Sequence, residues 1–122
     1  MPIIPLLKTT AIQPAIAFYT QILDFQLVGV WPGTDDPAYG VLTREGDELH
    51  LSSHAGDGVP GQKIIVLTAG AAQLLEKFRR RGLPASPKLD SPIHQGVVRQ
   101  TWGTQEFAVD TPDGHTLTFA QR

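Results

Sequence analysis

The sequence WGTQEFAVDTPDGHTLTF, residues 102–119, contains the clearest fold signal in this chain. Apolar and polar residues alternate on both sides of a central Pro-Asp-Gly, as Phe107 and Val109 before it and Leu117 and Phe119 after it. Proline presets φ for a turn, and glycine adopts the positive φ that other residues avoid. Alternation on both sides of such a turn predicts a β-hairpin.

Two amphipathic helices are predicted upstream of this hairpin. The first starts near Thr9-Thr10 and Pro14, since proline is tolerated in the first turn of a helix. The second ends at three consecutive arginines and Gly82, residues typical of a helix C-terminus. Apolar residues recur at helical spacing in both segments and predict that each helix covers a sheet: Ala15, Phe18, Tyr19, Ile22 and Leu23 in the first, and Ala71, Leu74, Leu75 and Phe78 in the second.

The remaining strands complete two units with the order β-α-β-β-β. One further strand is expected between Leu83 and Arg99, where three prolines obscure its position. We therefore predict an α+β fold of two βαβββ modules with curved mixed sheets, within a single domain, residues 1–122. Module one spans about 1–54, a linker about 55–61 and module two about 62–122. The other predicted strands are Ile3–Leu7, Gln26–Trp31, Tyr39–Thr43, Glu48–Ser52 and Lys63–Thr68.

Composition narrows the possible partners and location of the protein. A formal net charge of −2 gives no basic surface for nucleic acid, and the absence of cysteine excludes disulfides and thiolate chemistry. No apolar run is long enough to span a bilayer, and the first residues lack the features of a signal peptide. We expect a cytoplasmic protein without nucleic-acid or membrane partners.

Two motifs in the right order give the chain a resemblance to a known superfamily. Ala17-Phe18-Tyr19-Thr20 with Leu23-Asp24-Phe25 resembles the end of its first helix, and residues 102–119 resemble its C-terminal signature. The superfamily is that of glyoxalase, bleomycin-resistance and extradiol-dioxygenase proteins, also called vicinal oxygen chelate (VOC) proteins, and the bleomycin-resistance branch is most similar. The resemblance implies that paired modules form a cup, which dimerisation completes.

Strand alternation predicts which side chains face that cup. Leu49, Leu51, Leu117 and Phe119 should lie under the helices. The intervening residues should then face the opposite, concave side, which is polar enough to be a ligand cavity: Glu48, His50, Ser52, Thr116, Thr118, Glu106 and Ala108.

The resemblance also indicates four metal-ligand positions, on the first and last strands of each module. They fall near Ile3 or Ile4, at His50, near Ile64 or Ile65, and at Thr118. Only His50 has a donor suited to a catalytic divalent ion, and one imidazole cannot hold such an ion. We therefore expect no catalytic metal and no cofactor, and we interpret His50 as a hydrogen-bonded or solvated strand histidine.

Aromatic residues at loop edges are the best candidates for ligand contact. Trp31, Tyr39 and Trp102 present flat rings suited to stacking, although core packing or a dimer interface would also use them. Trp102 matches a residue near the drug groove of the bleomycin-resistance proteins. The predicted ligand-binding residues are Trp31, Tyr39, His50, Ser52, Trp102, Glu106 and Thr118.

These observations predict a homodimeric protein that sequesters a small amphipathic or aromatic ligand, with a glycopeptide antibiotic of the bleomycin type and antibiotic resistance as one form of this function. Two alternatives stay open. One is a metal-dependent VOC lyase, isomerase or dioxygenase with an atypical site, and the other is a non-enzymatic interaction protein.

Overall fold

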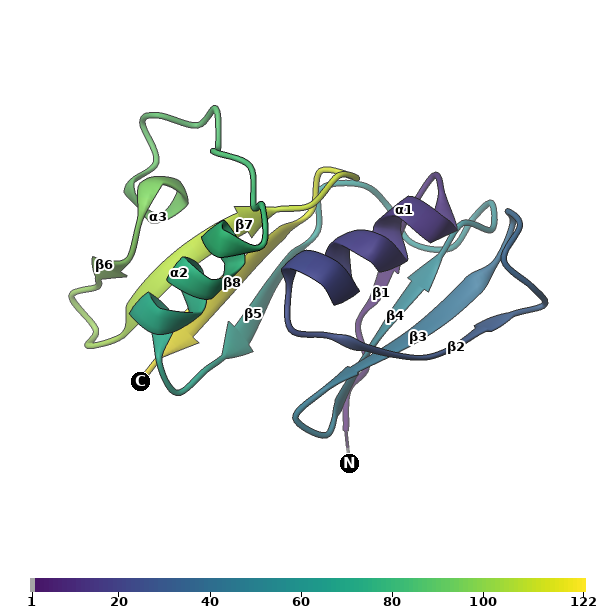
Figure 1. Ribbon diagram of the computed structural model, residues 1–122, viewed down its shortest axis with the longest axis horizontal. Helices are drawn as coiled ribbons and strands as arrows, with labels where there is room; N and C mark the ends of the chain where they lie inside the picture. The colour runs from purple at the N-terminus through teal and green to yellow at the C-terminus, as the bar shows by residue number, and fades with distance from the viewer. Residues whose placement is uncertain (1) are drawn as a thin grey trace. The chain divides into compact units, whose positions relative to one another are not determined.

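The computed structural model describes residues 2–122, which form two compact units (Figure 1). The first unit runs to Gln62 and also includes Pro112–His115. The second comprises Lys63–Thr111 and Thr116–Arg122. No helix among the described residues is long and apolar enough to cross a membrane.

The first unit contains one helical segment and four strands. Strand β1 (Leu6–Lys8) is followed by helix α1, which continues as a turn of π-helix, η1, and then by three strands. The sheet has the order β1-β4-β3-β2, with β1 parallel to β4 and the other neighbours antiparallel. The remaining elements are α1 (Ile12–Ala17), η1 (Phe18–Ile22), β2 (Gln26–Trp31), β3 (Tyr39–Arg44) and β4 (Asp47–Ser52).

The β3–β4 hairpin turns at Glu45-Gly46, where both residues have positive φ, 51° and 88°. This is the two-residue turn whose twist matches the twist of the strands. Arg44 and Asp47, the residues that flank this turn, are the last cross-strand pair of the hairpin.

The second unit repeats the same order with one added helix. Its sheet has the order β5-β8-β7-β6, with β5 parallel to β8. Figure 1 shows α2 lying across one face of this sheet. The elements are β5 (Lys63–Leu67), α2 (Ala71–Arg80), α3 (Pro92–Gln95), β6 (Val98–Arg99), β7 (Gln105–Asp110) and β8 (Thr116–Gln121).

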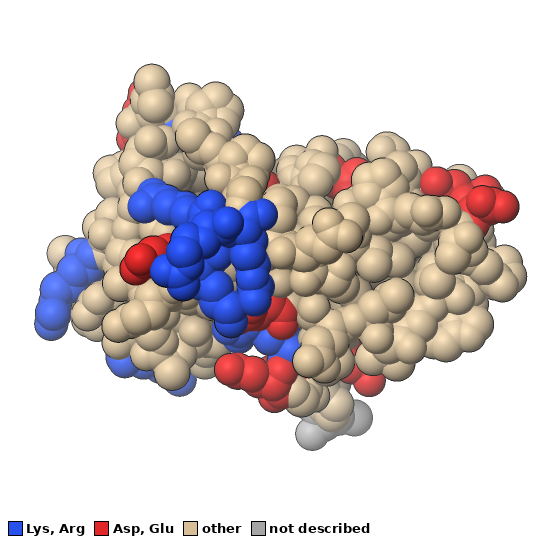
Figure 2. Space-filling view, viewed as in Figure 1, with Lys and Arg blue, Asp and Glu red and all other residues tan. Residues whose placement is uncertain are grey.

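Helix α2 ends as its sequence predicts. Gly82 adopts a φ of 99°, and the amide of Leu83 donates to the carbonyl of Phe78. This is the Schellman arrangement that glycine permits after a helix. Lys and Arg side chains gather over α2 in Figure 2, with Lys77, Arg79 and Arg80 in its last turn, where they favour the negative end of the helix dipole.

Each sheet packs one face against its own helix. In the first unit, Gly40 of β3 allows Ile12 and Ile16 of the helical segment to approach closely, with their Cδ1 atoms 3.6 and 3.5 Å from where a Cβ would lie. In the second unit, the ring of Phe78 from α2 packs edge-on against Phe107 and Phe119 at centroid distances of 6.0 and 5.2 Å. Such contacts place both cores between helix and sheet.

The structure confirms the α+β class and the βαβββ order in each half, and it corrects three boundaries. Strand β1 begins at Leu6 rather than Ile3, because Pro5 offers no backbone N–H to a strand ladder. The first helix begins at Ile12, before Pro14, and its second part is π-helical rather than α-helical. The strand expected between Leu83 and Arg99 is the short β6, preceded by an unexpected helix that starts with Pro92 at its first position.

His115 is a buried polar residue within the first unit. Its Nε2 donates to the carbonyl of Lys8 at 2.7 Å, and its Nδ1 accepts the amide of Gln62 at 3.1 Å. A neutral imidazole with its proton on Nε2 satisfies both partners. His115 therefore connects the Pro112–His115 turn to β1 and to the segment after β4.

We predict that His115→Phe destabilises the protein. Phenylalanine fills the space but removes two part-buried hydrogen bonds, to the amide of Gln62 and the carbonyl of Lys8, which costs about 1–3 kcal/mol of the free energy of unfolding. Urea denaturation measures this loss. His54→Phe is the matched control, because the half-buried His54 engages only its backbone amide and carbonyl in the described contacts. Equal stability of the two variants would contradict the prediction.

Candidate functional site

The face of the first sheet that points away from α1 carries a row of polar and aromatic side chains. Cross-strand register pairs Tyr39 with Ser52, Val41 with His50, and Thr43 with Glu48. Directly paired residues project to the same face of a sheet. Tyr39, His50, Glu48 and Ser52 therefore share the helix-distal face, as strand alternation predicts.

Three of these side chains form a continuous hydrogen-bonded chain. His50 Nε2 lies 2.8 Å from Glu48 Oε2, and His50 Nδ1 lies 2.6 Å from the hydroxyl of Tyr39. A carboxylate only accepts hydrogen bonds, so the imidazole proton lies on Nε2 and Nδ1 accepts the proton of the Tyr39 hydroxyl. This arrangement fixes the tautomer and the ring orientation of His50, and it leaves the lone pairs of the Tyr39 hydroxyl available to a ligand.

Ser52 belongs to a separate, buried contact. Its hydroxyl donates to Asp57 Oδ2 at 2.7 Å and accepts the amide of His54 at 3.1 Å. The residue is 0% exposed. Ser52 therefore holds the segment after β4 against the sheet and does not present a free hydroxyl.

The charges around Tyr39 favour its neutral form. Burial raises the pKa of the Tyr39 hydroxyl above its ordinary value, and the negative charges of Asp57 and Glu48 raise it further. A phenolate would be poorly solvated there and repelled by both carboxylates. Tyr39 thus remains a neutral hydroxyl at physiological pH.

Trp31 lies at the end of β2, directly across from Tyr39. Its indole lies over Gly29, where an added Cβ would come within 2.5 Å of the ring. The absence of a side chain at Gly29 therefore lets the ring lie flat over the backbone of β2. Trp31 remains 53% exposed, so its outer surface is open to contact.

The corresponding face of the second sheet carries Trp102, Glu106 and Thr118. Trp102 precedes the Gly103 turn and is 68% exposed, and its indole N–H donates to Glu106 Oε2 at 3.3 Å. The same oxygen accepts the hydroxyl of Thr104 at 2.6 Å. Glu106 thus holds the exposed indole beside the start of β7.

Thr118 is deeply buried between strand neighbours. It pairs with Ala108 of β7 and Ile65 of β5, and it is 2% exposed. Its Oγ1 has no hydrogen-bond partner among residues 2–122. A buried hydroxyl without a partner is unfavourable, and a ligand or water that reaches it would remove that cost.

The seven predicted residues belong to both units. Trp31, Tyr39, His50 and Ser52 lie in the first unit. Trp102, Glu106 and Thr118 lie in the second.

The donors required for a catalytic metal do not meet on these faces. Leu6, and not Ile3 or Ile4, is the β1 residue across from His50, and Ile65 lies across from Thr118. Leucine and isoleucine have no donor atom. Within the part of the chain that the structure describes, no three His, Cys, Asp or Glu side chains are grouped to hold a metal ion.

Sequence reasoning placed Glu48 on the correct face but did not connect it to His50. Their spacing of two on one strand was a signal for that contact, since such residues project to the same side. Asp57 and its bond to Ser52 had no comparable signal, because Asp57 lies in a Gly-rich loop whose path depends on tertiary structure.

Comparison with known proteins adds a family and a set of similar folds. A family described as "Glyoxalase superfamily protein" matches residues 1–122. A comparison with curated proteins finds no sequence match.

Several solved structures are similar over the whole chain. A bleomycin-binding protein complexed with bleomycin has 19% identity, covers 100% of this chain and 98% of its own, and has a TM-score of 0.77. TioX from Micromonospora sp. ML1 has 18% identity, coverages of 100% and 96%, and a TM-score of 0.74. A member of the glyoxalase/bleomycin resistance protein/dioxygenase superfamily from Sphaerobacter thermophilus DSM 20745 has 16% identity, coverages of 100% and 98%, and a TM-score of 0.74. At these identities the likeness establishes the fold.

We predict that Tyr39 titrates above the ordinary tyrosine range and that Asp57→Asn lowers its pKa. Removing a negative charge makes the phenolate less unfavourable, while asparagine can still accept the hydroxyl of Ser52. Absorbance of tyrosinate during alkaline titration measures the change, and a Tyr39→Phe spectrum separates Tyr39 from Tyr19. Asp47→Asn, a charge removal on the same strand pair, is the control. An unchanged pKa in Asp57→Asn would contradict the electrostatic cause.

Proposed function

Because this chain belongs to the glyoxalase superfamily, we propose that it binds and sequesters a small amphipathic or aromatic molecule. It does so as a single domain, with module one about 1–54, a linker about 55–61 and module two about 62–122. The ligand lies on the helix-distal faces of the sheets. It is held without a catalytic metal and without a chemical step.

The observation that carries this proposal is the exposure of both tryptophans beside polar residues that are already paired. Trp31 and Trp102 are each more than half exposed. Large aromatic rings are costly to leave in water and supply much of the contact energy in ligand sites. Stacking against a planar or heteroaromatic group is the use that best fits their exposure.

The polar neighbours give such a ligand its orientation. In the first unit, the Tyr39 hydroxyl is held by His50 and offers lone pairs to a ligand donor. In the second, Glu106 beside Trp102 offers a carboxylate to a cationic group. Thr118 adds a buried hydroxyl that a ligand can satisfy.

A glycopeptide of the bleomycin type combines the properties that this arrangement favours. It joins planar heteroaromatic rings to polar and cationic groups. One of the similar structures is of a bleomycin-binding protein with bleomycin bound, and another is of a bleomycin resistance determinant encoded on transposon Tn5. These likenesses support antibiotic binding, and hence antibiotic resistance, as the form of the function; we propose that the protein acts in the cytoplasm.

A second function is favoured by the Glu48–His50–Tyr39 chain. Carboxylate, imidazole and phenol in series resemble the arrangement that orients an acid–base group. A superfamily enzyme, such as a lyase, isomerase or dioxygenase with an atypical site, would use the Tyr39 oxygen to accept a substrate proton while the hydroxyl passes its own proton to His50. The lack of grouped metal donors on the described faces makes simple binding the better-supported function.

The proposal includes a homodimer. Ile65 and Leu67 of β5 are 65% and 48% exposed, and Ile3 and Ile4 before β1 are also exposed. Apolar side chains in such number on a small chain are typical of an interface with a second copy. The dimer would cover them and complete the ligand cup.

We predict that bleomycin quenches the tryptophan fluorescence of the protein saturably and that Trp102→Ala weakens its binding. The chain has only two tryptophans, so the signal reports on Trp31 and Trp102. Loss of one stacking ring should cost about 1 kcal/mol, or several-fold in affinity. Because Trp102 is largely exposed, the melting temperature should hardly change.

Leu89→Ala is the matched control, since Leu89 is a comparably exposed apolar residue away from the proposed ligand residues. Its affinity for bleomycin should equal that of the parent chain. Unchanged affinity in Trp102→Ala, together with a marked loss of stability, would assign Trp102 to structure and remove the main support for the proposal.

We predict that sedimentation equilibrium gives twice the chain mass. Burial of the exposed β5 residues drives association, so Ile65→Asp should shift the equilibrium toward monomer by placing a charge in the interface. A parent chain that stays monomeric at micromolar concentration would contradict the dimer.

A further inference from the structure

A cavity of about 370 Å³ lies in the second unit, apart from the predicted ligand residues. Its walls come from α2, the segment between α2 and α3, α3 itself and β7. They are mostly apolar, with Leu75, Leu83, Pro84 and Ile93 among them. This volume is within the range of small-molecule sites, which combine apolar walls with a few polar groups.

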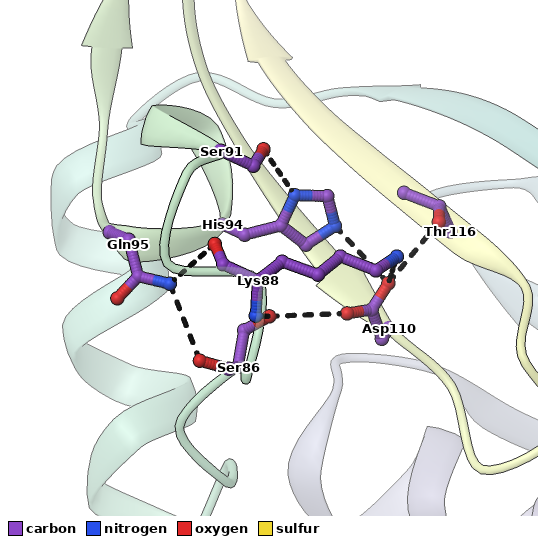
Figure 3. A network of polar contacts seen from close by, with 7 residues as sticks. All are labelled: Ser86, Lys88, Ser91, His94, Gln95, Asp110 and Thr116. Carbon is purple, nitrogen blue, oxygen red and sulfur yellow. Dashed lines mark hydrogen bonds and ion pairs between the residues drawn. The ribbon is translucent and has the colours of Figure 1, made fainter.

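The polar end of the cavity is built on Asp110, the last residue of β7. Figure 3 shows the side chains of Lys88, His94 and Thr116 converging on its carboxylate. Oδ1 accepts three hydrogen bonds, at 2.9 Å from Lys88, 3.1 Å from His94 and 3.3 Å from Thr116. Among the described residues, Oδ2 accepts a single hydrogen bond, at 3.3 Å from the hydroxyl of Ser86. The carboxylate therefore retains acceptor capacity at Oδ2.

Asp110 remains ionised in this setting. Burial would raise the pKa of its carboxyl, but the hydrogen bond from Lys88 and the charges of His94 and Lys88 hold the pKa below its ordinary value. The side chain is 26% exposed. A partly buried, ionised carboxylate at the end of an apolar cavity favours a cationic group.

The neighbouring His94 orients the Asp110 carboxylate and has no catalytic role. His94 Nε2 donates to Asp110, and its Nδ1 lies 2.7 Å from the hydroxyl of Ser91. Serine, histidine and aspartate in this order resemble a hydrolase triad, but Ser91 does not line the cavity. Its hydroxyl has no access to a molecule bound there, so this array orients His94 and Asp110 for binding.

Lys88 is the group that a cationic ligand would replace. Its side chain is 51% exposed and does not line the cavity, and Asp110 is its only ion-pair partner in the described contacts. Exposed ion pairs of this kind contribute little to stability, because water screens them and the long side chain loses freedom. An ammonium group with an apolar body can displace it at little cost.

Arg79 also lines the cavity and could attract an anion, but its contribution is weaker than that of Asp110. Its guanidinium donates to the carbonyl of Gln95 at 2.9 Å and the residue is exposed. Its charge is therefore better screened than that of Asp110. The Asp110 carboxylate therefore makes the cavity favour a cation over an anion.

We propose that this cavity binds a small primary amine with an apolar or aromatic body, whose ammonium pairs with Asp110 in place of Lys88 and whose body contacts Leu75, Leu83 and Ile93. Asp110 and Glu106 are four residues apart on β7, or roughly 13 Å along the strand. The amine site is thus separate from the one proposed around Trp102, and neither depends on the other.

The test is an NMR titration of the full chain with 2-phenylethylamine at low salt. Saturable amide shifts are expected in residues 83–96 and 108–110. The neutral analogue 2-phenylethanol should bind more weakly, and the anion 3-phenylpropionate more weakly still. Tighter binding of the anion than of the amine, or the absence of saturable shifts in these segments, would overturn the proposal.

Two variants test the roles of the charged residues. Asp110→Asn should weaken amine binding by about tenfold, since a charge-assisted hydrogen bond is lost. Asp110 also holds the 83–96 segment, so Lys88→Met provides an independent test: removal of the competing ammonium should strengthen amine binding several-fold. Lys77→Met makes the same change in net charge outside the cavity and should leave the affinity unchanged.

Equal affinity in Lys88→Met and Lys77→Met would overturn the proposed displacement. Trp102→Ala should retain amine binding, whatever its effect on bleomycin. Loss of bleomycin binding and loss of amine binding therefore report on different sites.

Discussion

Each sheet in this protein packs one face against its main helical segment, α1–η1 in the first unit and α2 in the second. The apolar side chains decide which face of each sheet the helix covers. Leu49 and Leu51 in the first sheet, and Phe107 and Phe119 in the second, are buried on the helix side. The alternation of strand side chains then sends every second residue to the other side. The location and the polarity of the candidate ligand surface both follow from this single constraint.

Polar residues on the uncovered faces satisfy one another before any ligand arrives. Glu48, His50 and Tyr39 form one chain, and Glu106 accepts from both Thr104 and Trp102. Side chains paired in this way have defined orientations and little freedom to lose on binding. The exposed indoles of Trp31 and Trp102 lie beside these paired side chains. Such an arrangement suits the proposed function, in which a ligand is held without being changed.

The segment between α2 and β6 adds a different kind of site at the edge of β7. Here a short helix brings His94 and the preceding loop brings Lys88 to one carboxylate, Asp110. The cavity beneath them has mainly apolar walls and one anionic end. The chemistry of this cavity differs from that of the helix-distal faces, which carry the exposed indoles.

Sequence alone determined the order of the elements apart from helix α3, and the faces of the strands, because these depend on local periodicity. The hairpin of residues 102–119 and the cap at Gly82 are local in this sense. Tertiary structure decided the partners of His50 and Ser52, the burial of Thr118, and the meeting of Lys88 and His94 on Asp110. Those contacts join residues that loop conformation brings close together. Loop conformation has no periodic sequence pattern from which it could be predicted.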